Sequence, residues 1–88
     1  MQIEFDPAKD GANLAKHGVS LLEANSFEWE DCITWQDERV VYSERRDCAI
    51  GYIENRLYFI VFTDRSDTRR IISLRKANKR EETFYAST

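Results

Sequence analysis

His17 is the only histidine of the chain, and histidine is the side chain whose ordinary pKa lets it change charge between pH 5 and pH 8. Lys16 directly precedes it and supplies a cation. A base beside a cation is suited to acid–base chemistry on a phosphate. A lone histidine at a helix end more often caps or packs the helix, and on these residues alone both interpretations stay open.

A second group of charged side chains lies in the last third of the chain. From Arg69 to Arg80 there are six basic residues and no acidic one, although the net charge of the chain is −3. Such a strip can hold phosphate groups, or it can be the solvated face of an edge strand and a helix. The six residues are Arg69, Arg70, Arg75, Lys76, Lys79 and Arg80.

Metal-free RNA cleavage is the reaction class that these side chains would suit together. It needs a base for the ribose 2′-OH, cations for the charge that develops on the phosphate, and an acid for the leaving 5′-oxygen. His17 or Glu81 could be the base, and His17 or Tyr85 the acid. The spacing leaves open whether the groups converge. The candidate cations are Lys16, Arg65 and Arg75.

The elements that must position His17 are a strand and a helix. Residues 1–5 alternate in polarity and predict a strand. Asp6-Pro7 is a typical helix start, with Asp as N-cap and Pro in the first turn. The helix is predicted over Pro7–His17 and ends at Gly18. Its inward face is predicted to hold Ala8, Ala12 and Ala15 or Leu14.

A second helix is predicted directly after Gly18. Ser20 and Glu23 have the spacing of a capping box, and the helix is predicted to end near Trp29. Its buried residues are predicted to be Ala24, Phe27 and Leu21 or Leu22. The connection between the two helices is short, and it therefore places His17 at a corner.

The second half of the chain predicts an antiparallel meander followed by a helix. The meander strands are predicted over Asp47–Ile53, Leu57–Thr63 and Arg69–Arg75, and the helix over Ala77–Ala86. Residues Cys32–Trp35 predict a further short strand. Along the last meander strand, strict alternation places side chains on two faces. One face would hold Arg70, Ile72 and Leu74, and the other Arg69, Ile71, Ser73 and Arg75.

Length and composition favour one domain over residues 1–88, because there is no room for a second core. The longest apolar run, Leu57–Phe62, is too short to span a membrane, and the start of the chain is unlike a signal peptide. Cys32 and Cys48 have no partner at metal-ligand spacing. We therefore expect a cytoplasmic protein with no metal and no cofactor.

The charge is unevenly distributed along the chain. Residues 1–38 hold two basic and nine acidic residues, whereas residues 39–88 hold eleven basic and seven acidic ones. One basic face for an anion and one acidic face for another partner would fit this asymmetry. Trp29 and Trp35 lie in the acidic half, where they could be core residues or anchors for a protein partner.

Two stretches are similar to the BrnT toxins. FDPAKDGANLAKHGVSLLEA, residues 5–24, resembles the N-terminal signature of that family, and RRIISLRKANKREETFY, residues 69–85, resembles its C-terminal ending. The resemblance spans roughly residues 3 to 85 in order. Leu74 stands where the family usually has a small residue, and Glu82-Thr83 replaces a more basic stretch.

The resemblance implies a ribonuclease toxin of a type II toxin–antitoxin module that inhibits translation by degrading RNA. The predicted elements form an α+β fold, with a β-α-α unit, then three or four antiparallel strands and a C-terminal helix, and the resemblance implies that this fold is RelE-like. A BrnA-like antitoxin would neutralise the toxin in a hetero-oligomer, and DNA would be contacted only through the antitoxin. The positions that match the active surface are Lys16, His17, Arg65, Arg75, Glu81 and Tyr85.

The other candidate residues follow from these roles. Arg69, Lys76, Lys79 and Arg80 are expected to bind the RNA substrate, and Trp29 and Trp35 to contact the antitoxin. The alternative is a weakly catalytic or non-catalytic module that binds the antitoxin and acts mainly as a corepressor. A small α+β domain of another function is the third possibility.

Overall fold

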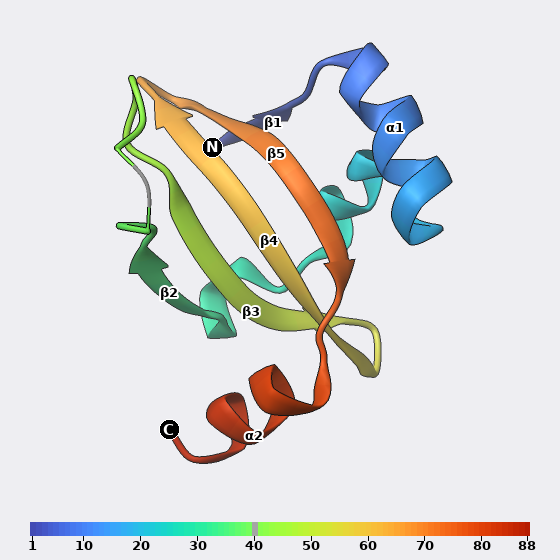
Figure 1. The fold of residues 1–88 in the computed structure, drawn as a ribbon, viewed down its shortest axis with the longest axis vertical. Helices are drawn as coiled ribbons and strands as arrows, with labels where there is room; N and C mark the ends of the chain where they lie inside the picture. Colours follow the sequence, from blue (N-terminus) through green and yellow to red (C-terminus); the bar gives the residue numbers. More distant parts are fainter. Residues whose placement is uncertain (40) are drawn as a thin grey trace.

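The computed structural model describes residues 1–39 and 41–88 as an α+β arrangement around a mixed sheet (Figure 1). The described strands are β1 (Gln2–Glu4), β2 (Ile33–Gln36), β3 (Asp47–Ile53), β4 (Arg56–Arg65) and β5 (Thr68–Lys76). The helices are α1 (Pro7–His17), the 3₁₀ helices η1 (Leu21–Ser26) and η2 (Trp29–Asp31), and α2 (Lys79–Ala86). The expected α+β class is therefore confirmed.

The strands lie in the order β1-β5-β4-β3-β2. The three strands of the expected meander pair antiparallel as β3, β4 and β5. Strand β2 pairs with β3, also antiparallel, and forms the edge of the sheet opposite β1. β1 pairs with β5 in parallel. The sheet is thus mixed, because the chain crosses from β1 to the opposite edge through α1 and the 3₁₀ helices before it returns.

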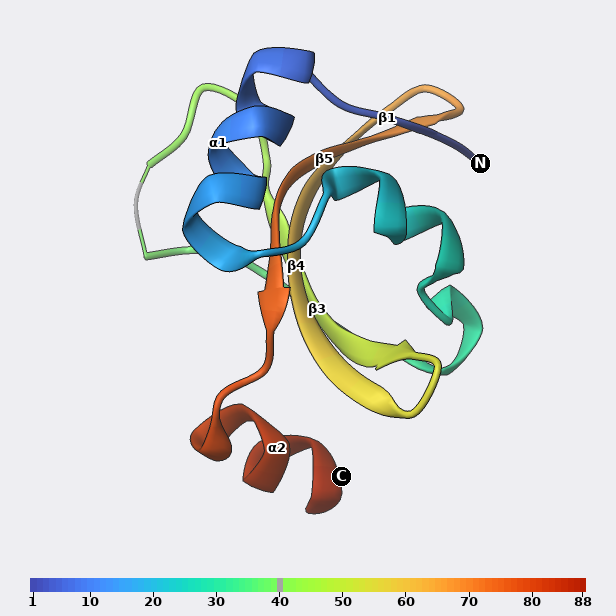
Figure 2. The same cartoon turned by 90° about the vertical axis from the view of Figure 1, so that its right-hand side faces the viewer.

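The sheet has a core on each of its faces. One core holds Leu21, Ala24 and Phe27 from the η1 region against strand residues that include Ile60 and Leu74. Figure 2 shows η1 and η2 covering this face, which we call the η face. The other core contains Cys48, Ile50, Leu57, Phe59, Val61 and Ala77. We call that side the groove face; the burial of β4 on both faces explains its almost continuous apolar sequence.

β5 does not alternate strictly, so the predicted assignment of its faces is confirmed for Arg69 to Ile72 and is wrong beyond Ile72. The pairing shifts beside Val61/Phe62: Phe62 opposes Ile71, but Val61 opposes Ser73. Ile72 is the extra residue of this β-bulge, which reverses the alternation beyond it. Ile71 and Leu74 therefore share the η face, whereas Ile72 packs against the core of the groove face.

The predicted inward face of α1 is also wrong. Asn13 is the buried residue of the helix. Its amide donates to the carbonyls of Leu74 and Val19, both at 2.8 Å, and accepts from the N–H of Leu74 at 3.2 Å. The side chain thus occupies the edge of β5 beyond the end of β1, in place of a strand. The exposed residues include Ala8, Ala12, Leu14 and Ala15.

The ends of α1 match the prediction. The Asp6 carboxylate accepts the N–H of Ala8 at 2.9 Å, and Gly18 caps the C-terminus in the left-handed conformation, with φ of 73°. Glycine adopts this conformation without the steric cost that a side chain would add. Lys16 and His17 consequently lie in the last turn of α1, at the corner that the sequence predicted.

The second helix is not the continuous α-helix that the sequence predicts. It is replaced by η1 and η2, with Phe27 extended between them. Ser20 still acts as N-cap through the N–H of Leu22, and its hydroxyl also donates to Asp10 of α1. Leu21, Ala24 and Phe27 are buried as predicted. The Phe27 ring approaches Gly51 so closely that a Cβ there would lie 2.7 Å from it.

The C-terminal helix α2 begins at Lys79, two residues after its predicted start. Asn78 is its N-cap: the Asn78 side chain accepts the N–H of Glu81, and the Glu81 carboxylate accepts the N–H of Asn78, each at 2.9 Å. This capping box fixes the turn between β5 and α2. Among the described residues, no helix is long and apolar enough to cross a membrane.

Candidate active site

A groove of about 840 Å³ opens on the groove face, between the end of β5, β2 and α2. Its floor is apolar and includes Ile50, Phe59 and the exposed edge of Trp35. Charged side chains from three parts of the chain line it: Asp37, Glu38, Arg39, Arg75, Arg80 and Glu81. An apolar floor with a charged rim is the composition expected of a ligand site.

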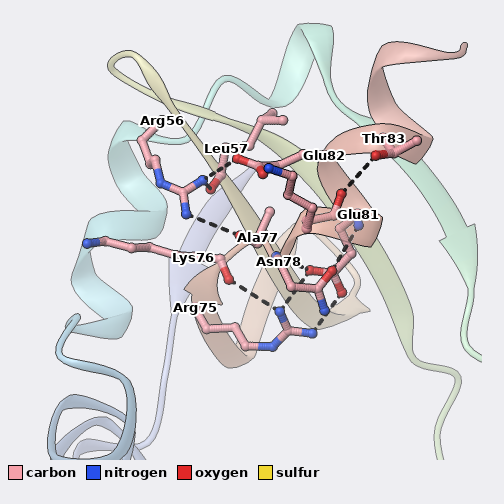
Figure 3. A network of polar contacts seen from close by, with 10 residues as sticks. Arg56, Leu57, Arg75, Lys76, Ala77, Asn78, Glu81, Glu82 and Thr83 are labelled. Carbon is pink, nitrogen blue, oxygen red and sulfur yellow. Dashed lines mark hydrogen bonds and ion pairs between the residues drawn. The ribbon is translucent and has the colours of Figure 1, made fainter.

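Arg75 is held firmly at the edge of this groove. Its guanidinium donates to both oxygens of the Glu81 carboxylate at 2.8 Å and to the carbonyl of Lys76 at 3.3 Å (Figure 3). The same group lies over the Phe59 ring, 4.4 Å from its centroid. A bidentate pair and a ring contact fix the plane of the guanidinium. Arg75 is therefore preorganised rather than free to rotate.

Glu81 serves Arg75 and the helix cap at once. Burial raises the pKa of the Glu81 carboxyl, but the hydrogen bonds from Arg75 and from the N–H of Asn78 outweigh burial and hold it below its ordinary value. Glu81 is therefore an ionised partner of Arg75. A carboxylate with a depressed pKa is a weaker proton acceptor than the sequence hypothesis of a Glu81 base requires.

His17 lies near enough to Arg75 for the two charges to interact. Desolvation lowers the pKa of His17, and the positive charges of Lys16 and Arg75 lower it further. The imidazole is consequently neutral at neutral pH. Lys16 and His17 are not among the residues that line the groove, and the charge interaction with Arg75 is what places His17 near it. A neutral imidazole can accept a proton from a substrate.

Tyr85 does not line this groove. Its hydroxyl donates to the carbonyl of Asp31 at 3.3 Å, and its ring packs edge-on against Tyr52, with 5.6 Å between the ring centroids. It faces a separate hollow that also contains Arg56 and Glu82. Desolvation and nearby ionisable groups, Tyr52 first, raise the pKa of the phenol. The structure thus separates Tyr85 from Arg75, although Glu81 and Tyr85 share α2.

Arg56 anchors α2 beside that hollow. Its guanidinium donates to Glu82 at 3.0 Å and to the carbonyls of Leu57 at 3.3 Å and Ala77 at 3.2 Å (Figure 3). These bonds join the start of β4 to the first turn of α2. They hold the helix that carries Glu81 in place against the sheet.

Arg65 lies far from Arg75. It pairs with Glu44 at 2.6 Å, and it opposes Thr68 at the beginning of β5, whereas Arg75 opposes Phe59. Six residues of strand separate Phe59 from Arg65, which corresponds to about 20 Å. Antiparallel pairing therefore places the two predicted cations at opposite ends of the same strands.

The predicted substrate-binding residues are spread over two faces. Arg69 lies on the η face, stacked on the Trp29 and Phe62 rings at 4.5 Å and 4.4 Å and paired with Asp64 at 2.7 Å. Arg80 lines the groove beside Arg75. The side chains of Lys76 and Lys79 are exposed, and Lys76 opposes Tyr58, which packs against the core of the η face. Of the four, only Arg80 is brought directly to the groove.

The two tryptophans have different environments. The Trp29 ring packs edge-on against Phe27 and Phe62, and its indole N–H donates to the carbonyl of Ala24 at 3.1 Å. Trp35 lines the groove, 36% exposed, and meets Phe59 and Phe84 edge-on. Trp29 is thus integrated into the η face, and Trp35 presents an aromatic edge to the groove.

Several residues of the groove were not predicted. Phe59 supports Arg75, and the buried Asp37 receives bonds from Arg39 and Tyr42. The hydrogen bonds from Arg39 lead a set of contacts that hold the pKa of Asp37 well below its ordinary value, against the effect of burial. The pattern Asn78-x-x-Glu81 was a readable signal for the cap, whereas nothing local in the sequence identifies the contacts of Phe59 or Asp37.

The two cysteines and the possible metal ligands were the remaining candidates for chemistry. Burial raises the pKa of the Cys48 thiol to about 11, and burial likewise raises that of Cys32. Residues 1–39 and 41–88 contain no group of three or more His, Cys, Asp or Glu side chains placed to hold a metal ion. Metal-independent cleavage stays a prediction.

The comparison with protein families matches most of the chain. Residues 5–81 fit the family model described as "Ribonuclease toxin, BrnT, of type II toxin-antitoxin system". A search among curated proteins finds no matching relative. The matched range includes both His17 and Arg75, which the fold brings near enough for their charges to interact.

Proposed function

Because the chain belongs to the BrnT family of ribonuclease toxins of type II toxin–antitoxin systems, we propose that it cleaves RNA in the Arg75 groove without a metal ion. The observation that carries this proposal is the preorganised Arg75 guanidinium with the neutral His17 nearby. A fixed cation and a base are the two groups that attack by a ribose 2′-OH needs first.

In the proposed reaction, His17 accepts the proton of the 2′-OH while the 2′-oxygen attacks the adjacent phosphorus. Arg75 and Arg80 face the non-bridging oxygens and stabilise the negative charge that develops on them. The bond to the 5′-oxygen then breaks, with Lys16 offsetting the charge on that oxygen until solvent protonates it. The products are a 2′,3′-cyclic phosphate and a free 5′-hydroxyl.

Glu81 has a positioning role in this proposal. It holds the Arg75 guanidinium through two bonds and is itself fixed by the cap at Asn78. Glu81→Gln keeps the size of the side chain but removes the charge that pairs with Arg75. We expect it to weaken catalysis by loosening Arg75, without removing the base.

The test of the proposal is cleavage of RNA by the purified protein in EDTA, with His17→Ala and Arg75→Ala as variants. We expect each variant to lose at least about a hundredfold in rate, because each removes a group that acts in the transition state. Arg45→Ala is the matched control: Arg45 is an exposed arginine paired with Asp47, outside the groove. Full cleavage by both His17→Ala and Arg75→Ala, or cleavage abolished by EDTA, would contradict the mechanism.

Repeating the cleavage assay with assembled ribosomes distinguishes cleavage of free RNA from cleavage that requires the ribosome. Cleavage of free RNA means that the groove acts on the strand directly. Cleavage seen only with ribosomes and abolished in Arg75→Ala keeps the groove as the active site but makes the ribosome part of the substrate. No cleavage in either arm would favour the non-catalytic corepressor.

The corepressor alternative rests on a specific feature, the aromatic edge of Trp35 beside Phe84, which is 47% exposed. We propose that a BrnA-like antitoxin covers this end of the groove and so blocks RNA. Trp35→Ala should weaken antitoxin binding more than Trp29→Ala does in those molecules that remain folded, because Trp29 packs within the η face. Equal antitoxin affinity of Trp35→Ala and the wild type would contradict this contact.

We further propose that the element order corresponds to a RelE-like topology and that the protein acts in the cytoplasm, where its RNA substrate is. The support for the topology is the β-α-η unit followed by the antiparallel strands β3, β4 and β5 and by α2. An experimental structure superposed on RelE-like toxins tests the first statement, and fractionation of producing cells tests the second.

A further inference from the structure

A second hollow lies on the groove face, at the end of the sheet where β4 ends and β5 begins. Its lining contains four cationic side chains from different parts of the chain: Lys9 of α1, Arg46 before β3, Arg65 of β4 and Arg70 of β5. We call these residues the distal basic cluster. Neither the family match nor the reaction in the Arg75 groove assigns a role to this cluster as a unit.

The β-bulge places Arg70 on this face together with Arg75. Two strand residues five positions apart ordinarily point to opposite faces. Because Ile72 is inserted between them, Arg70 and Arg75 both project from the groove face. The irregularity of β5 therefore aligns two arginines along one surface, one at each end.

Helix α1 also has a cation near each end of this surface, which extends from Arg70 to Arg75. Lys9 and Lys16 are seven residues apart, which is about two turns, so they lie on one side of the helix. Lys9 lies at the distal basic cluster, while Lys16 and His17 lie at the end of the helix near Arg75. The helix thus supplies a cation at each end of the path that β5 marks with Arg70 and Arg75.

The cluster keeps donor capacity for an anion. Arg65 pairs with Glu44, and both side chains are about half exposed. The Arg70 Nε lies 3.2 Å from the Glu4 carboxylate as an ion pair; this atom is buried and makes no hydrogen bond among the described residues. An anion would therefore meet the terminal nitrogens of Arg70, whose side chain is 30% exposed. Arg46 stacks over the Tyr42 ring at 4.3 Å, and neither it nor Lys9 forms an ion pair within residues 1–39 and 41–88.

We propose that the distal basic cluster binds a backbone phosphate of the RNA strand, several nucleotides away from the phosphate that is cleaved at Arg75. The proposal rests on the proposed ribonuclease function. The separation of about 20 Å between Arg65 and Arg75 is more than one phosphate group can bridge, so the two positions bind different phosphates of one strand. Arg65 then contributes to substrate binding and not to the chemical step.

The experiment compares two substrates, a dinucleoside monophosphate and a single-stranded RNA long enough to reach both ends of β5. Arg70→Gln and Lys9→Gln should each raise KM for the long RNA, by about tenfold for Arg70→Gln, and leave kcat unchanged. Neither should affect the dinucleotide. The salt slope of binding should fall by about 0.7 for each phosphate that the variant no longer neutralises, and Arg45→Gln is the matched control.

An equal loss on both substrates, or no loss on either, would overturn the inference. Lys9→Gln guards against a folding artefact, because Lys9 is exposed on α1 and contributes to no core. Arg70→Lys keeps the charge, and it should recover most of the affinity for the long RNA.

A binding arm separates this inference from the ribonuclease proposal. A long RNA with 2′-O-methyl groups lacks the attacking hydroxyl and so reports binding alone. If the wild type cleaves no RNA but binds this strand, and Arg70→Gln weakens that binding, the site stands although the ribonuclease proposal fails. If the variants bind the strand as the wild type does and instead lose affinity for the antitoxin, the cluster is a protein contact and the inference is wrong.

Discussion

His17 is the residue on which the proposed chemistry depends, and the direction of its pKa shift decides its role. Desolvation, Lys16 and Arg75 all lower the pKa from 6.5, so the folded protein keeps the imidazole neutral at pH values where the unfolded chain is already protonated. Above the unfolded value, both states are neutral and the shift has no effect on stability. Stability should fall as the pH decreases below it.

The titration of His17 can be followed directly, because the chain has a single imidazole. We expect its NMR signal to titrate with a midpoint below 6.5. Lys16→Gln should raise that midpoint, since it removes the larger of the two charge effects on His17. A wild-type midpoint that is not lowered from this ordinary value would contradict the assignment of His17 as a neutral base.

Asn13 shows how a single polar side chain can hold the site residues in register. Asn13→Ala leaves the Leu74 N–H and the carbonyls of Leu74 and Val19 without their partner. A buried group that loses its hydrogen bond costs about 1–3 kcal/mol. We expect a loss of at least that size in the free energy of unfolding, measured with denaturant.

The matched control is Asn25→Ala. Asn25 is exposed on η1, where its amide donates to the carbonyl of Leu22. Its loss should stay within about 0.5 kcal/mol, as for most surface substitutions. Similar losses for Asn13→Ala and Asn25→Ala would mean that the edge of β5 does not depend on the Asn13 amide.

The turn from β5 into α2 is the element that sets the geometry of the groove. Asn78 caps the helix, and the same cap orients Glu81 toward Arg75. Asn78→Ala should cost about 1 kcal/mol of stability and lower the cleavage rate further than this loss explains, because Glu81 loses its anchor. Asn78→Asp preserves a cap acceptor and should retain both stability and activity.

Unfolding in denaturant and the rate of RNA cleavage at saturating substrate are the two measurements that check this prediction. The wild type, Asn78→Ala and Asn78→Asp are compared under conditions in which all three are folded. An Asn78→Ala protein that loses stability but cleaves RNA at the wild-type rate would show that the cap does not position Arg75.

Elements whose signals are local were predictable from the sequence. The caps Asp6, Gly18 and Ser20 are set by residues within one helical turn, and all three lie where the pattern placed them. The end of η1 was not predictable, because a 3₁₀ segment and an α-helix share the same start signals. Tertiary contact of Phe27 with Gly51 decides the outcome there.

The face that each arginine of β5 occupies could not be predicted, since it depends on pairing with β4. A bulge at Ile72 reverses the alternation of the side chains. The polarity pattern of residues 69–75 does not indicate this bulge. For the same reason, the sequence grouped Arg65 with Arg75, although antiparallel pairing puts them at opposite ends of the sheet. Asn13 was missed because amphipathic analysis of a helix seeks apolar residues.

At the scale of the whole molecule, we propose that the chain folds as one cooperative domain. The radius of gyration, 12.5 Å, is close to the value of about 12 Å expected for a compact domain of this length. Both cores include residues of β3 and β4. A loss of packing on one face should therefore be transmitted to the other through shared strands.

The structure shows where the basic residues of the second half of the chain lie. The basic second half supplies Arg75 and Arg80 to the groove and Arg65 and Arg70 to the distal basic cluster. Carboxylates from both halves pair with many of these cations, as Glu4 does with Arg70 and Glu81 with Arg75. The acidic net charge thus coexists with cations gathered at two places on one face.

The central claim is that a ribose 2′-OH attacks a phosphate held in the Arg75 groove. The most direct measurement compares a cleavable RNA with the same strand carrying one 2′-deoxy nucleotide at the cleaved position, followed by analysis of the product ends. We predict cleavage of the first strand to a 2′,3′-cyclic phosphate and a 5′-hydroxyl, and none of the second. Cleavage of the deoxy strand at the same position, or products with a 5′-phosphate, would contradict the account.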